Sequence, residues 1–241
     1  MQLDFRSREL TIKLVYYGPA LSGKTTNLQS LHKVVAQDAT GRLMTLDTKD
    51  DRTLFFDLLP LNFKAKSGVS VRIKVFTVPG QAIHASTRRL VVQGADGVVF
   101  VADSQRAETQ NNTTAFLDLK SNLEANGLSL KTMPVVIQFN KRDLPPDQIR
   151  TNEELAELAK RGREPVYLAV AMKGTGVVET FLGLLQMTWR SLNEQHDFDR
   201  KFGFEPDAFV QMVATKLGAL GAASRLINTR LPGAGAAARS E

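Results

Sequence analysis

The stretch that decides the fold is Gly18-Pro-Ala-Leu-Ser-Gly-Lys-Thr25, which follows an apolar run and opens a helical pattern. It matches G-x-x-x-x-G-K-[ST], in which glycines let backbone N–H groups wrap a phosphate chain. The N-terminus of the following helix adds positive potential. Lys24 is expected to reach the β- and γ-phosphates, and the Thr25 hydroxyl is expected to bind Mg²⁺. The motif therefore predicts a nucleoside triphosphate site without choosing between ATP and GTP.

The residues expected to line this phosphate site are Gly18, Ala20, Leu21, Ser22, Gly23, Lys24, Thr25 and Thr26. A chance glycine-rich turn is the alternative interpretation. It is disfavoured because the motif stands between a strand pattern and a helix pattern, which is the context that phosphate binding requires.

Apolar runs alternate with helical patterns along the chain. The predicted strands are 10–17, 97–102, 135–139 and 166–170, with a hairpin of 63–66 and 69–76 joined at Ser67-Gly68. The predicted helices are 24–37, 108–126, 151–162 and 176–193, while 38–60 is irregular at first and then apolar. Such alternation indicates an α/β fold with a parallel sheet covered on both faces. Ligands of such sheets bind at the carboxyl ends of the strands, where all the motifs lie.

Asn140-Lys-Arg-Asp143 selects the base. It follows the strand predicted at 135–139. The Asp143 carboxylate can accept hydrogen bonds from N1–H and the 2-amino group of guanine, whereas adenine has no matching pair of donors. Lys141 can lay its stem along the base, and Asn140 can brace the loop or reach the base. A charged turn is the alternative, but the strand end and the preceding phosphate motif favour guanine recognition.

Together these stretches resemble the small Ras-like GTPases, and in particular the bacterial MglA family. The runs that carry the resemblance are Tyr16–Pro19, Gly23–Asn27, Asp51–Asp57, Thr77–Gln81, Asp96–Ser104 and Asn140–Pro145. The resemblance covers roughly residues 5–190. It implies a P-loop NTPase fold with a Ras-like, six-stranded, mostly parallel sheet flanked by helices. It also implies GTP and GDP as ligands, Mg²⁺ as cofactor, and GTP hydrolysis that is slow without an activating protein.

The resemblance assigns roles to residues between the two motifs. Thr53 corresponds to a threonine that ligates Mg²⁺ when the γ-phosphate is present, and Arg52 to an arginine that stabilises the transition state. Gly80 is implied to donate its N–H to the γ-phosphate, and Gln81 to orient the attacking water. Lys24, Arg52 and Gln81 are thus the implied catalytic residues. After the last strand, Val170 and Ala171 are implied to contact the base, with the Ala171 N–H facing the guanine O6.

Composition limits the other function classes. The chain has 241 residues, 43% hydrophobic, no cysteine and a net charge of +6. Its basic residues alternate with acidic ones, so no dedicated nucleic-acid site is expected. The N-terminus has no apolar signal segment and no cysteine is present for a lipid anchor, so a cytoplasmic protein is expected. An ATP-using enzyme is disfavoured by Asn140–Asp143. A GTP-bound scaffold with negligible hydrolysis remains the alternative to a GTPase switch.

Partners are implied only by the resemblance. They are a Roadblock-fold homodimer of the MglB type as activator, and downstream effectors of cell polarity or gliding motility that recruit the protein to a cell pole. The GTPase domain is predicted to span 1–195 and a C-terminal extension 196–241. The extension holds a possible amphipathic helix at 207–229, and from Leu231 onward it is predicted to be disordered. A floppy tail and a partner-binding or self-docking helix both remain open.

Two departures from the Ras-like pattern bear on the rate. Thr77 stands where most Ras-like proteins carry aspartate, although threonine is typical of the MglA family. Ala20 stands where related proteins usually carry glycine, beside the γ-phosphate. Ala20→Gly is expected to raise the rate of phosphate release, because the methyl group crowds the arginine and glutamine. An unchanged rate at saturating GTP would contradict this steric effect.

Overall fold

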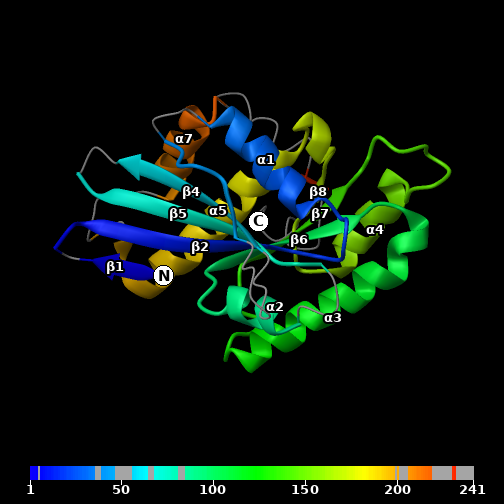
Figure 1. Cartoon of the computed structure of the whole chain (residues 1–241), viewed down its shortest axis with the longest axis horizontal. Helices are drawn as coiled ribbons and strands as arrows, with labels where there is room; N and C mark the ends of the chain where they lie inside the picture. Colours follow the sequence, from blue (N-terminus) through cyan, green and yellow to red (C-terminus); the bar gives the residue numbers. More distant parts are fainter. Residues whose placement is uncertain are drawn as a thin grey trace, which may run out of the picture.

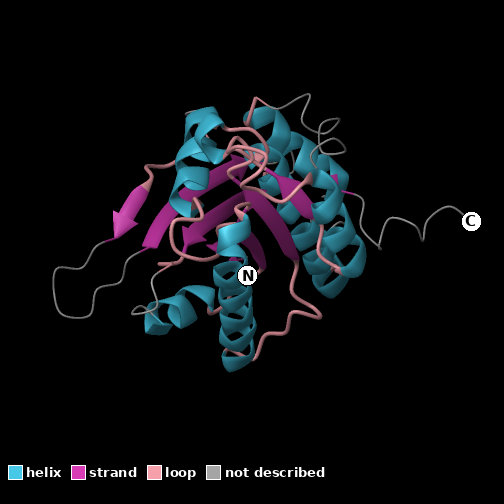
Figure 2. Ribbon diagram, turned by 90° about the vertical axis from the view of Figure 1, so that its right-hand side faces the viewer, coloured by secondary structure: helices cyan, strands magenta, loops and turns pink. Residues whose placement is uncertain are grey.

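A computed structural model describes residues 1–4, 6–35, 39–46, 56–64, 68–80, 85–198, 200, 206–218 and 230–231. Among them a single mixed sheet forms the centre, with helices on both faces (Figure 1, Figure 2). The strands are β1 (Gln2–Asp4), β2 (Glu9–Tyr17), β3 (Met44–Leu46), β4 (Phe56–Lys64), β5 (Ser70–Thr77), β6 (Gly97–Asp103), β7 (Val135–Asn140), β8 (Val166–Leu168) and β9 (Arg230–Leu231). The predicted α/β architecture is confirmed.

The sheet has the strand order β3-β4-β5-β2-β6-β7-β8-β9, and β1 also pairs with β2. The central pairs β5–β2, β2–β6, β6–β7 and β7–β8 are parallel, while β1, β3, β4 and β9 add antiparallel pairs. The parallel strands therefore all end at one edge. The described sheet has nine strands rather than six, because β1, β3 and β9 are pieces of two or three residues without a pattern of their own.

Two apolar clusters separate the faces of the sheet. On one face α1 (Lys24–Val34), α5 (Val177–His196) and α7 (Pro206–Lys216) cover β2 residues such as Leu14 and Tyr16. On the other, α2 (Ala85–Val92), α3 (Thr109–Ala125) and α4 (Asn152–Arg161) cover Val15 and Tyr17. Alternate residues of β2 thus serve the two clusters, as strand geometry requires. Two short 3₁₀ turns, η2 (Arg106–Glu108) and η3 (Ala171–Lys173), lie in the connections.

Several predicted boundaries need correction. The first helix ends at Val34 rather than 37, since Val35 is already extended. The hairpin is confirmed, but β4 begins at Phe56 instead of 63; its buried positions start with Asp57, and Pro60 interrupts the apolar pattern. Helix α2 was not predicted. Strand β8 ends at Leu168 instead of 170, where the chain turns into a loop.

The described pieces of the C-terminal extension are helix α7, which packs on α5, and strand β9. Helix α7 ends at Lys216, shorter than the predicted 207–229, and residues 219–229 lie outside the described part of the chain. Its predicted apolar face, including Phe209 and Val213, is buried against α5. Leu231 was predicted to start a disordered tail but pairs in β9 with β8 instead. No described helix is long and apolar enough to cross a membrane.

Helix α5 approaches the sheet closely at Gly183. A Cβ atom added there would lie 2.0 Å from the Tyr167 hydroxyl oxygen and 2.5 Å from its ring. Gly183→Ala on an open helix face would stabilise the protein by about 1 kcal/mol. Here we expect it to destabilise by about 1–3 kcal/mol, because the buried ring must shift. Urea unfolding measures the sign, and a gain in the free energy of unfolding would contradict the close packing.

Candidate functional site

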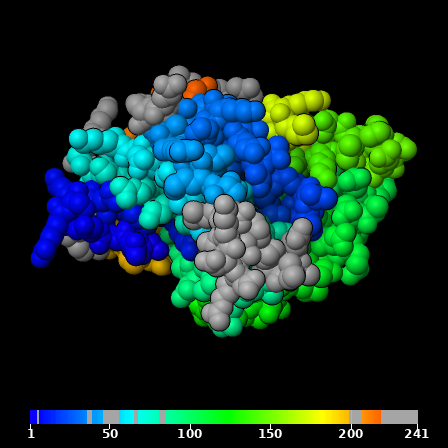
Figure 3. Space-filling view, viewed as in Figure 1, coloured from blue at the N-terminus to red at the C-terminus, as the bar shows by residue number. Residues whose placement is uncertain are grey.

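The phosphate loop and the base motif meet at the carboxyl edge of the parallel strands. The phosphate loop follows β2, Thr77 ends β5, Asn140 ends β7, and the loop 169–176 follows β8. In the space-filling view the segment of α1 (blue) lies at the surface between the β4–β5 hairpin (cyan) and the region of α3 and α4 (green) (Figure 3). The topology thus brings together residues that are far apart in the sequence.

Two glycines shape the phosphate loop. Gly18 has φ +147° and Gly23 has φ +98°. An added Cβ would lie 2.2 Å from the Val101 carbonyl oxygen at Gly18, and 2.2 Å from the Asn140 side-chain nitrogen at Gly23. The loop therefore admits no side chain at either position. Leu21 also has positive φ, at 60°, and is 88% exposed.

Lys24 lies inside this loop. Its ammonium donates hydrogen bonds to the carbonyl oxygens of Gly18 (3.0 Å) and Pro19 (2.6 Å). Beside it is a cavity of about 630 Å³, lined by residues that include Ala20, Thr25, Thr26, Phe56, Thr77 and Gly80. A Cβ added to Gly80 would lie 2.4 Å from the Ala20 Cα and 2.9 Å from the Lys24 ammonium. The predicted γ-phosphate contacts Lys24 and Gly80 are thus brought together at one cavity.

Asp57 is a site residue that the sequence analysis missed. It is buried, and its carboxylate accepts hydrogen bonds from the hydroxyls of Thr25 (2.6 Å) and Thr77 (2.9 Å). The Thr45 hydroxyl donates to the other oxygen at 2.8 Å, and the Asp57 N–H donates to Thr77 Oγ1 at 2.9 Å. A carboxylate therefore lies beside the predicted Mg²⁺ ligand Thr25. The hairpin register, which places position 57 opposite Thr77, was the signal that could have found it.

Asn140 joins the two halves of the site. Its side-chain nitrogen donates to the Ser22 carbonyl at 2.8 Å, and its side-chain oxygen accepts from the Ala171 N–H at 2.9 Å. Asn140 thus braces the loops in this structure, the first of its two predicted roles. The Ala171 N–H, predicted to face the guanine O6, is used here for that bond.

The two charged residues of the base motif have partners as well. Lys141, with φ +65°, pairs with buried Asp103 at 2.6 Å. Asp143 lies 3.5 Å from the Lys173 ammonium and keeps about a third of its side chain exposed. Lys173 follows Val170 and Ala171 in the next loop. The four predicted base-contact positions Lys141, Asp143, Val170 and Ala171 therefore belong to two loops that touch each other.

A second cation lies near the phosphate loop. Arg88 of α2 is buried and pairs with Asp118 of α3 at 2.7 Å, and Asp118 also accepts a hydrogen bond from the Tyr17 hydroxyl. Burial lowers the pKa of Lys24 to about 8, with repulsion from Arg88 adding to the shift and Asp57 opposing it. An environment that disfavours a free ammonium favours binding of an anion. Arg52, Thr53 and Gln81 fall outside the described residues, so their predicted roles stay predictions.

The depressed pKa of Lys24 gives a pH dependence. A lysine of the unfolded chain has a pKa of about 10.4. Between about pH 8 and 10 the unfolded chain holds a proton that folded Lys24 has released, so stability rises with pH. The free energy of unfolding of the nucleotide-free protein should rise relative to that of Lys24→Met across this interval. Urea unfolding near pH 7.5 and 9.5 measures it, and a constant difference would contradict the shift.

Comparison with known proteins identifies the family of this chain. The chain is 42% identical over 192 residues to the mutual gliding-motility protein MglA of Myxococcus xanthus, a match that spans 80% of this chain and 97% of that protein. Ras-related protein Rab-4B of Homo sapiens is 29% identical over 115 residues, 48% of this chain and 52% of Rab-4B. No protein-family model matches. Because the match to the Myxococcus protein spans nearly the whole of that protein at this identity, the chain belongs to the MglA family of Ras-like small GTPases.

Proposed function

We propose that this protein is a molecular switch that binds GTP with Mg²⁺, hydrolyses it slowly and changes partners when the γ-phosphate is lost. The observation that carries the proposal is the pair of hydrogen bonds by which Asn140 joins the phosphate loop to the loop 169–176 after β8. A phosphate loop alone serves any nucleoside triphosphate. The motif that begins at Asn140 also carries the Asp143 carboxylate, which supports a base subsite beside the phosphate loop. Because guanine offers that carboxylate two donors and adenine does not, the site favours GTP.

The oxygen ligands fit Mg²⁺. Mg²⁺ prefers hard oxygen donors and keeps several waters, binding through one or two carboxylates and the substrate phosphates. Thr25 supplies a hydroxyl and Asp57 a buried carboxylate 2.6 Å from it. Asp57 thereby supplies the negative charge that most Ras-like proteins carry at the position of Thr77. We propose that Asp57 holds the metal through water and that the Thr77 hydroxyl orients its carboxylate. Thr53 is proposed as the ligand added in the GTP state.

Hydrolysis needs charge stabilisation and a positioned water. Lys24 neutralises charge on the β- and γ-phosphates, and Gly80 beside it donates to the γ-phosphate. Arg52 is proposed to stabilise charge in the transition state, and Gln81 to orient the water. With the metal, these groups stabilise charge that spreads over the transferred phosphoryl oxygens. Slow hydrolysis is proposed because the Ala20 methyl group crowds Arg52 and Gln81 beside the γ-phosphate. Slow hydrolysis in turn makes an activating partner necessary.

The cellular role is proposed from the family. The relative in Myxococcus is named for gliding motility, which supports a role in bacterial motility or polarity. We propose a cytoplasmic protein, recruited to a cell pole by partners, with an MglB-type Roadblock-fold homodimer as activator. The similarity to MglA is the support for each of these. In this scheme the activator acts by placing Arg52 and Gln81.

Substitution of Asp57 tests the metal site. Asp57→Asn keeps the shape but removes the charge, so the Mg²⁺ concentration for half-maximal GTP hydrolysis should rise about 10- to 100-fold. The double variant Asp57→Asn/Thr77→Asp should recover much of the loss, because it returns a carboxylate from the paired strand. Glu179→Gln, which removes a buried carboxylate on α5, is the control. An unchanged Mg²⁺ requirement in Asp57→Asn would remove Asp57 from the metal site.

Turnover separates a switch from a GTP-bound scaffold. Arg52→Ala and Gln81→Leu should bind GTP normally and release phosphate about 10³-fold more slowly in the presence of activator, as expected when an arginine finger is lost. Phosphate release after rapid mixing measures the rate, and binding of a fluorescent GTP analogue provides the control. Normal turnover in Arg52→Ala would show that this arginine is not the finger.

A further inference from the structure

We propose that the C-terminal extension slows nucleotide release by bracing the base loop, here residues 169–176. This inference rests on the proposed guanine nucleotide site. The base loop is flanked by β8 on one side and α5 on the other. The two described pieces of the extension, α7 and β9, contact those two elements: α7 packs on α5, and β9 pairs with β8. The extension therefore contacts both of the elements that flank the base loop.

Helix α7 holds α5 by stacking and by charge. The rings of Trp189 on α5 and Phe209 on α7 are stacked with centroids 4.1 Å apart, and both are fully buried. Asp207 accepts hydrogen bonds from Gln186 and Arg190, each at 3.2 Å. Because α7 buries its apolar face here, its position is linked to that of α5.

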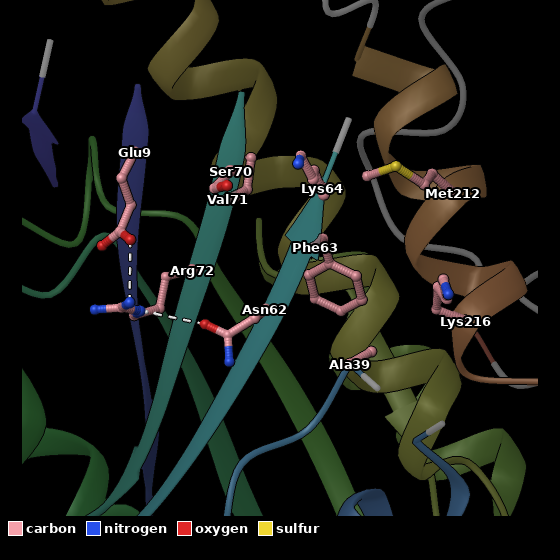
Figure 4. Close-up of a pocket in the computed structure, with 10 residues that line it drawn as sticks. All are labelled: Glu9, Ala39, Asn62, Phe63, Lys64, Ser70, Val71, Arg72, Met212 and Lys216. Atoms are coloured by element: carbon pink, nitrogen blue, oxygen red, sulfur yellow. Dashed lines mark hydrogen bonds and ion pairs between the residues drawn. The ribbon is translucent and has the colours of Figure 1, made fainter. Parts of the chain in front are cut away.

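The other side of α7 is less closely packed. Met212 and Lys216 face the end of the β4–β5 hairpin across a cavity of about 340 Å³, with Phe63 and Lys64 on the far side (Figure 4). In the same view Arg72 bonds to Glu9 and Asn62 on the strands and not to α7 (Figure 4). Arg72 is thus paired with β2 and β4. The helix is anchored on α5 more than on the hairpin.

Helix α5 is connected in turn to the nucleotide loops. The Thr180 hydroxyl donates to the Gly176 carbonyl at 2.6 Å and accepts from the Gln138 amide at 2.9 Å. Gln138 exchanges two hydrogen bonds with Asn27, whose amide also donates to the Gly23 carbonyl of the phosphate loop at 2.9 Å. Thr180, Gln138 and Asn27 are all fully buried. A shift of α5 would break these hydrogen bonds and leave buried polar groups without partners. Because such groups are costly to leave unpaired, the hydrogen bonds resist a shift of α5.

Strand β9 acts on the other end of the base loop. Strand β8 has three residues, and its last, Leu168, leads directly into the loop. On its outer edge Val166 and Tyr167 pair with Leu231 and Arg230. The Tyr167 ring packs against Gly183 in the middle of α5, one turn before Gln186. Tyr167 thus contacts both β9 and α5. A movement of either element therefore acts on β8, which leads into the base loop.

The release rate of a fluorescent GDP analogue, chased with excess unlabelled GDP, tests the inference in the full-length chain. Phe209→Ala removes the stacked ring and should speed release by about 2- to 30-fold, the usual range of coupling between distant sites. Val213→Ala, a smaller truncation of the same buried face, should act in the same direction if Phe209→Ala does not fold. Arg230→Pro/Leu231→Pro removes N–H donors from β9 and should also speed release.

The control is Leu123→Ala, an equally buried truncation in the apolar cluster on the opposite face of the sheet. It should leave the release rate near that of the unaltered chain. Fluorescence of Trp189, the single tryptophan, reports whether α7 has left α5. The inference would be overturned if the α7 variants expose Trp189 and both they and the β9 variant release the analogue as slowly as the unaltered chain. That result would leave the proposed function standing. Absence of fluorescent GDP binding to the unaltered chain would instead overturn the proposed function.

Discussion

The site depends on one asparagine side chain. Asn140 donates to the phosphate loop and accepts from the base loop, and its amide lies so close to Gly23 that a Cβ there would collide. Without this junction the two loops would be separate turns at neighbouring strand ends. Because one planar amide bonds to both loops, Asn140 helps to fix the spacing between the proposed base and phosphate subsites. In the proposed function, that spacing lets one guanine nucleotide contact both loops.

A second constraint is the placement of negative charge. Buried Asp57 is tolerated because the hydroxyls of three threonines donate hydrogen bonds to its carboxylate oxygens. It also offsets part of the positive potential from Lys24 and Arg88. Moving the carboxylate from the position of Thr77 to the paired strand keeps a charge beside Thr25 while changing which element carries it. The proposed metal site therefore depends on the hairpin register as much as on the phosphate loop.

Much of the site was predictable from the sequence where the chemistry is local. Gly18 and Gly23 form the expected loop because only glycine fits their φ and their close contacts, and Asn140 follows the expected strand. Asp57 was missed since its role comes from a partner across the hairpin. Strand β4 was predicted too short because Pro60 and the buried acid hide its alternation.

The extension was beyond local prediction for a related reason. Its helix has an apolar face that was recognisable, but nothing in that face specifies which surface it covers. The surface that the extension covers is determined by the stacking of Phe209 on Trp189 and by the free edge of β8 that β9 pairs with. Both exist only once the domain has folded. Hydrogen bonds from α5 through Thr180 and Gln138 then connect the extension to the loops of the proposed nucleotide site.

The most direct measurement is a paired titration of the purified protein with fluorescent GTP and ATP analogues in the presence of Mg²⁺, repeated on Asp143→Ala. The account predicts tight binding of the GTP analogue and weak binding of the ATP analogue. It also predicts that Asp143→Ala loses most of this discrimination, because the guanine donors then have no carboxylate. A site that requires these hydrogen bonds discriminates by about 10⁴ or more. Equal affinity for both analogues, or discrimination that survives in Asp143→Ala, would contradict it.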